Sequence, residues 1–122
     1  MTPAISDQQL LASRPPLARS YRLLWTAIVE VADKIDLGLT SGGHRYMVPI
    51  IGGSFYAGPG VEGLSGTILP GGADRQFLRD DGVKELHAVY EMQAQDGTIL
   101  SIDNQVLVDD TAEPDRYAMS VI

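Results

Sequence analysis

Two polar pairs in the second half of the chain have the residue types and spacing that acid–base chemistry needs. Asp74 and Gln76 are two residues apart, so in an extended strand both side chains point to one face. Glu85 and His87 share a face of the next stretch by the same alternation. An Asp-Gly turn joins the two stretches, so antiparallel pairing is expected to bring the two polar pairs close together.

Such a cluster predicts proton transfer on a small carbonyl compound, because a carboxylate and an imidazole both exchange protons near neutral pH. Asp74 and His87 are the predicted catalytic groups, and Arg45 and Gln76 are predicted to position the ligand. The reaction type is isomerase, lyase or hydrolase, and no cofactor is expected. No metal is expected either, because the two histidines are far apart in the sequence.

Each of these residues also has a purely structural interpretation, and the sequence leaves both open. Asp74 follows a Gly-Gly pair, where an aspartate commonly bonds its own backbone in a turn. His87 lies between Leu86 and Ala88, which belong to the more apolar face, so it fits a solvated outer position. Arg45 fits a surface charge or an ion-pair partner of Asp74 as well as a ligand contact.

Two aromatic residues, Trp25 and Tyr90, are predicted to line the wall of the binding site. Trp25 alternates with apolar residues in the stretch 22–32, and Tyr90 does the same in the stretch 83–92. Core packing is the alternative role for both, because large aromatic side chains dominate protein cores.

Short strands separated by glycine-rich and Asp-Gly turns must position these residues. Strands are expected at 22–32, 33–40, 44–56, 63–69, 73–79, 83–92, 98–108 and 116–122. The glycine pair at 52–53 predicts a bend inside the third strand, and such bends let a sheet curl on itself. We therefore predict an all-β fold, a small antiparallel β-barrel over residues 21–122. Residues 1–20 are predicted to be a leader outside the barrel, either flexible or weakly helical with Ser6 as the N-cap.

Composition excludes several function classes. The net charge of −7 argues against nucleic acid and anionic membrane surfaces as partners, because both are bound by excess Lys and Arg. The chain has no cysteine, which excludes disulfides, thiolate nucleophiles and zinc–sulfur sites. Neither a signal-peptide pattern nor a membrane-length apolar run is present, so we expect a cytoplasmic protein.

Several motifs occur in a fixed order, and together they carry a family resemblance. They are VPIIGGSF at 48–55, GPG at 58–60, GTILPGGADRQ at 66–76, DGVKELHAVY at 81–90 and DGTI at 96–99. This pattern resembles the bacterial and fungal family called domain of unknown function 3237 (uncharacterised protein family 0311), over roughly residues 21–108. The resemblance implies a small antiparallel β-barrel similar in shape to the lipocalins. The family has no settled activity, so the resemblance implies a fold rather than a function.

Two departures from the family pattern bear on the expected assembly. Arg75 stands where family members commonly have an aromatic residue, and the sequence ends without the family's further C-terminal strands. The barrel is therefore expected to be open or to be completed by a partner chain. An unpaired strand edge is a template for association, so we expect a homodimer.

Two functions follow from these observations. In the first, the barrel mouth binds a small apolar or aromatic metabolite, with or without cofactor-free acid–base catalysis, because ligand sites favour barrel mouths. In the second, the chain is a non-catalytic oligomeric module that acts through its open edge and acidic surface.

Overall fold

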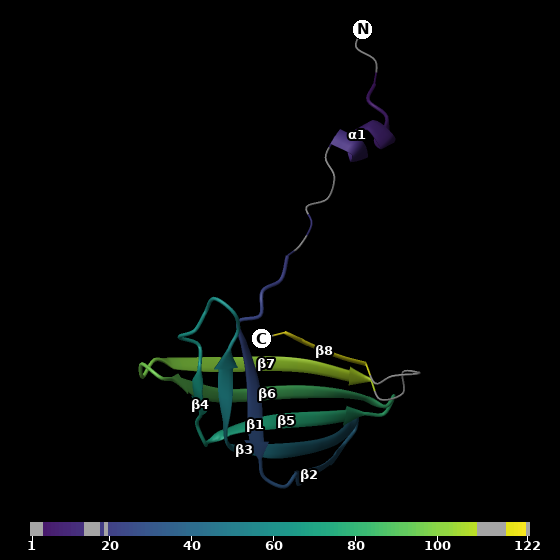
Figure 1. The fold of residues 1–122 in the computed structure, drawn as a ribbon. Coiled ribbons are helices and arrows are strands. Elements are labelled where there is room, and N and C mark those ends of the chain that lie inside the picture. Colours follow the sequence, from purple (N-terminus) through teal and green to yellow (C-terminus); the bar gives the residue numbers. More distant parts are fainter. Residues whose placement is uncertain (1–3, 14–17, 19, 110–116, 122) are drawn as a thin grey trace.

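Eight strands form one antiparallel sheet, and a short helix precedes them (Figure 1). The computed structural model describes residues 4–13, 18, 20–109 and 117–121. The elements are α1 (Asp7–Ser13), β1 (Trp25–Val31), β2 (Ile35–Thr40), β3 (Gly43–Ala57), β4 (Gly66–Ile68), β5 (Gly72–Arg79), β6 (Val83–Ala94), β7 (Ile99–Asp109) and β8 (Tyr117–Val121). The predicted all-β antiparallel class is confirmed.

The long strand β3 organises the sheet, because four other strands pair with it. Its first half pairs with β2 on one side and β5 on the other, and its second half pairs with β1 and β4. Strand β6 then pairs with both β4 and β5, and β7 and β8 follow in turn. The sheet curls so that its inner face is concave (Figure 1).

A bend at the glycine pair of β3 changes which residues face inward. Before the bend the even-numbered residue Ile50 is buried, and after it the odd-numbered residue Phe55 is buried. The register to β1 shifts at this point, where Ile51 is the extra residue of a bulge. Gly53 has a φ of 136°, and a Cβ there would lie 2.2 Å from the carbonyl oxygen of Ile28. Only glycine fits this position, which explains the predicted bend.

The core occupies one end of the concave face. Its buried members are Ile50, Phe55, Ile68, Tyr90, Met92, Ala94 and Ile102. Trp25, Ala27 and Val29 of β1 pack against this cluster, which confirms the alternation predicted for that stretch. Leu23 and Val31 lie on either side of these three and are exposed, Leu23 because it precedes the strand and Val31 because it follows the register shift.

Side-chain caps fix the two Asp-Gly turns. Asp81 Oδ1 accepts a hydrogen bond from the Val83 backbone N–H at 3.1 Å, and Asp96 Oδ1 accepts one from the Thr98 N–H at 2.9 Å. These backbone bonds are the main reason why the pKa of each carboxyl is lowered. Both aspartates are therefore turn residues, as predicted.

Helix α1 begins with a capping box, as the predicted N-cap at Ser6 requires. The Gln9 N–H donates to Ser6 Oγ at 3.2 Å, and the Ser6 N–H donates to Gln9 Oε1 at 3.0 Å. The helix ends at Ser13. Of the helical residues that the structure describes, none belongs to a helix with the length and apolarity needed to cross a bilayer.

Candidate functional site

The strand register places Asp74 on the concave inner face. Residues paired directly across antiparallel strands share a face of the sheet. One row across β3, β5, β6 and β7 consists of Val48, Asp74, Ala88 and Asn104. The next row along the same strands consists of Tyr46, Gln76, Leu86 and Val106. Asp74 and Gln76 therefore share the inner face, as the alternation predicts.

Two oxygen atoms in the first row lack a partner. Gln76 Nε2 donates a hydrogen bond to Asp74 Oδ2 at 3.0 Å, which fixes the carboxylate. Asp74 Oδ1 and Asn104 Oδ1 are both buried and, within the part of the chain that the structure describes, accept no hydrogen bond. The two residues lie two strand spacings apart, roughly 10 Å between backbones. Only the methyl group of Ala88 stands between them in the row.

His87 lies on the opposite face of the sheet from Asp74. It pairs with Arg75 and Gln105, and its exposed ring places Nε2 2.7 Å from Asp103 Oδ1. The expected cluster of Asp74 and His87 at one mouth therefore does not form. The reason is a single residue of register, because Asp74 pairs with Ala88 and strand side chains alternate faces.

The other predicted ligand-binding residues are divided between the two faces. Arg45 pairs with Phe77 and is exposed on the outer face, away from the face that carries Asp74. Tyr90 is buried in the core cluster next to the row of Asp74, and this burial raises the pKa of its hydroxyl. Trp25 is half-buried against the same cluster. Both aromatic residues pack in the core, which was the alternative to lining the wall of a binding site.

A second polar cluster on the inner face involves His44, which has no assigned role in the sequence-based site. His44 Nε2 lies 2.5 Å from Asp36 Oδ1, and its ring stacks on Tyr46 with 4.5 Å between centroids. Lys34 Nζ lies 4.1 Å from the Tyr46 ring centroid. The hydrogen bond from His44 is the largest cause of the lowered pKa of Asp36, and the Gly38 N–H at 2.8 Å is the second.

This arrangement predicts a titration result. In His44→Phe, which keeps an aromatic ring over Tyr46, we expect the pKa of Asp36 to rise part of the way to its ordinary value, because the Gly38 bond remains. Carboxyl-carbon NMR measures it, with His87→Phe as the control that leaves Asp36 unchanged. The lowered pKa of Asp36 in the folded state stabilises the protein at pH values above the unfolded-state pKa, and this stabilisation is lost as the pH falls through the folded-state pKa. His44→Phe should therefore lose less stability in acid than the wild-type protein. An unchanged pKa of Asp36 in the variant would contradict the assignment.

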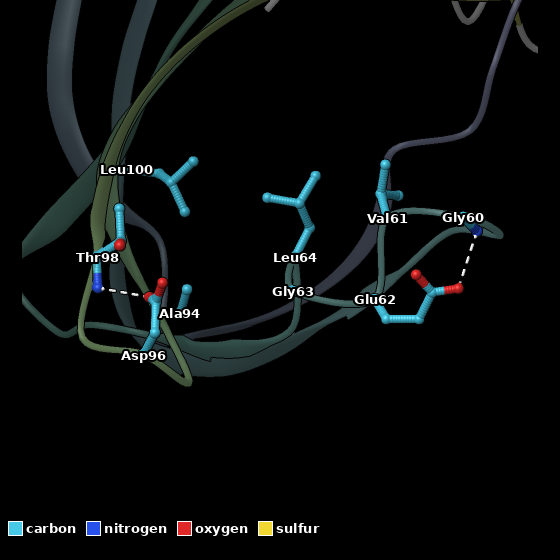
Figure 2. Close-up of a pocket in the computed structure, with 9 residues that line it drawn as sticks. All are labelled: Gly60, Val61, Glu62, Gly63, Leu64, Ala94, Asp96, Thr98 and Leu100. Atoms are coloured by element: carbon cyan, nitrogen blue, oxygen red, sulfur yellow. Dashed lines mark hydrogen bonds between the residues drawn. The ribbon is translucent and has the colours of Figure 1, made fainter.

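A pocket of about 490 Å³ opens at the end of the molecule away from His44, between the β3–β4 loop and the β6–β7 turn (Figure 2). It is lined by Gly60, Val61, Glu62, Gly63, Leu64, Ala94, Asp96, Thr98 and Leu100. Figure 2 shows the side chains of Val61 and Leu64 pointing the same way and the side chain of Leu100 pointing toward Leu64. The carboxylates of Glu62 and Asp96 each accept a backbone hydrogen bond in their own loop. The nine lining residues include no Lys, Arg or His. The pocket is therefore lined by apolar side chains together with the two carboxylates.

Neither Asn104 nor the pocket was predicted as part of a site. Alternation along 98–108 puts Asn104 on the same face as Leu100 and Ile102, so a lone amide on an apolar face was the available signal. The pocket depends on the path of the loop after Gly58, for which the sequence offers only turn residues.

Known proteins share both the sequence pattern and the fold. The model of the family described as "Protein of unknown function (DUF3237)" matches residues 20–116. A UPF0311 protein of Rhodopseudomonas palustris is 33% identical over 90 residues, covering 74% of this chain and 55% of the relative. The chain thus spans just over half the length of that relative.

Two solved structures are similar to the chain. A protein with unknown function from Clostridium acetobutylicum has a TM-score of 0.73 at 28% identity, covering 83% of this chain and 72% of that one. A protein described as β-barrel-like from Acinetobacter baumannii has a TM-score of 0.54 at 29% identity, covering 78% and 56%. The chain therefore belongs to the DUF3237 family, as its motifs predict, and has the β-barrel-like fold of its relatives.

Proposed function

We propose that the inner face around Asp74 and Asn104 binds a small molecule that has an apolar body and a hydrogen-bond donor group. The observation that supports this is the pair of buried, unpartnered oxygens, Asp74 Oδ1 and Asn104 Oδ1. A buried acceptor without a donor costs about 1–3 kcal/mol. A ligand hydroxyl or ammonium group that donates to these oxygens recovers that free energy on binding.

The surroundings of the two oxygens define the ligand further. Both orphan atoms are acceptors and one belongs to a carboxylate, so an anionic ligand group is disfavoured and a hydroxyl or ammonium is favoured. The neighbouring inner side chains Val48, Leu86 and Val106 are apolar and only half-buried, so they are available to an apolar ligand body. Asp74 is the one proton-exchanging group of its row, so an acid–base step on the bound molecule would use Asp74 without His87.

The test separates ligand binding from stability in one variant. In Asn104→Leu, which keeps the branching and the number of side-chain heavy atoms, an unpartnered acceptor is lost, so we expect the free protein to be about 1–2 kcal/mol more stable in urea unfolding. The same variant should bind hits from a library of alkyl and aryl alcohols and amines at least tenfold more weakly in NMR titrations.

Gln105→Leu on the outer face of the same strand is the matched control, and it should leave binding unchanged. Equal binding by Asn104→Leu and the wild-type protein, or a library in which only carboxylates bind, would contradict the proposal.

A second candidate function is association with another copy through the sheet edge. Among the described strands, β1 pairs only with β3 and leaves its other edge unpaired. Ile28 on this edge strand is 60% exposed and Leu24 beside it is also exposed. Unpaired apolar edges favour strand-to-strand pairing between identical chains.

Native mass spectrometry and light scattering test this association. We expect a homodimer that Ile28→Lys converts to monomer, because a lysine on the edge strand opposes pairing. Thr67→Lys, an exposed change on a strand inside the sheet, is the control and should leave the dimer intact. A wild-type monomer at all concentrations would remove this candidate.

A further inference from the structure

Helix α1 has features of a docking element, although none of its residues is buried against the sheet. It has seven residues and none of them is buried, whereas isolated helices of this length are marginal in water. Its start is nevertheless well built, with the capping box of Ser6 and Gln9. Ile5 and Leu10 occupy the N′ and N4 positions, where apolar residues form a staple that sets the direction of the entering chain.

We propose that α1 docks within its own chain into the pocket between the β3–β4 loop and the β6–β7 turn. The helix offers Ile5, Leu10 and Leu11, all exposed, with Leu11 at 69%. The pocket offers Val61, Leu64 and Leu100, and the Leu100 side chain points toward Leu64 (Figure 2). Docking removes both apolar sets from water and supplies the packing that a short helix needs.

The chain enters the sheet at the margin of this pocket. Arg22 Nη2 donates to the carbonyl oxygen of Gly60, a pocket residue, at 2.9 Å, and the Gly58 N–H donates to the Leu24 carbonyl at 2.8 Å. Figure 1 shows the chain entering β1 beside the β3–β4 loop. Residues 14–20 separate the helix from Tyr21, and seven residues span up to about 25 Å. The helix is therefore tethered close enough to reach the pocket.

The basic residues of the tether complement the acidic residues of the pocket. Glu62 and Asp96 give the pocket lining two carboxylates and no basic residue, while Arg22 contacts the Gly60 carbonyl at its margin. The segment 14–20 that accompanies the helix contains Arg14 and Arg19 and no acidic residue. Arg14 and Arg19 therefore offset the repulsion between Asp7 of α1 and the two carboxylates of the pocket.

Disulfide trapping tests the proposal directly, because the natural chain has no cysteine. In the full chain, Leu11→Cys with Leu64→Cys is expected to form an intrachain disulfide at least tenfold faster under mild oxidation than Leu11→Cys with Leu39→Cys. Leu39 is 77% exposed on β2, on a strand that takes no part in the pocket, and serves as the accessible control. Mass spectrometry distinguishes intrachain from interchain products. Equal rates for the two pairs, or products only between chains, would overturn the proposal.

Hydrogen exchange provides a second measurement that needs no cross-link. We expect the amides of Leu10 and Leu11 to exchange at least threefold faster in Leu64→Asp than in the wild-type chain, because the charge opposes docking. Leu39→Asp is the control and should leave α1 exchange unchanged. Identical exchange of α1 in all three proteins would also overturn the proposal.

Discussion

Replacing Gly53 with alanine is expected to lower the free energy of unfolding by at least about 3 kcal/mol. Two costs combine at this position. The φ of 136° lies in a region that side-chain-bearing residues rarely adopt, and the added Cβ would sit 2.2 Å from the Ile28 carbonyl oxygen. Since that oxygen belongs to the neighbouring strand, the clash can be relieved only by separating β1 from β3. Trp25, Ala27 and Val29 would then lose their packing against the core.

Urea unfolding followed by tryptophan fluorescence measures this effect, because Trp25 is the single tryptophan and belongs to β1. Gly63→Ala is the matched control, since a Cβ at Gly63 meets nothing within 4 Å and its φ is not positive. We expect the control to change stability by less than about 0.5 kcal/mol. Equal stability of the two variants would mean that β3 does not bend at the glycine pair as described.

Local sequence signals predicted most of the fold because they act over few residues. Alternation assigned the face of β6 correctly and that of β1 as far as Val29, and the Asp-Gly pairs located both hairpin turns. The bend in β3 followed from a glycine pair inside an apolar run. Each of these features depends on side-chain period or on backbone freedom, both of which can be read from neighbouring residues.

The candidate site was harder to predict because it depends on pairing between strands. Asp74 and His87 looked like neighbours across a hairpin, but a register in which Asp74 meets Ala88 puts them on opposite faces. Asn104 joins the site only because β7 pairs with β6 in the register that aligns it with Ala88. The contact between His44 and Asp36 likewise requires the β2–β3 register, which shifts between Asp36 and Gly38. A shift of one residue reverses every such assignment, and alternation within one strand does not reveal it.

Truncating Phe55 to alanine is the second large effect that we expect, at about 3–5 kcal/mol of lost stability. Phe55 is 1% exposed and is among the largest fully buried side chains of the described residues. It follows the bend, so it enters the core cluster only because the bulge reverses the inward face of β3. Neighbouring backbones pair on both sides of this residue, with Ala27 on β1 and Gly66 on β4, so the cavity has little freedom to collapse.

Tyr56→Ala is the control for Phe55→Ala, because it also removes an aromatic ring but from an exposed position. Tyr56 is the next residue and is 55% exposed on the outer face. Urea unfolding of both variants should show a loss of less than about 1 kcal/mol for Tyr56→Ala. If the order of the two losses were reversed, the inward face after the bend would be the even-numbered one. The core would then lie on the other side of β3, and the row that carries Asp74 would no longer share a concave face with the residues packed around Phe55. The comparison of Phe55 with Tyr56 therefore tests, through stability alone, the geometry on which the proposed binding face depends.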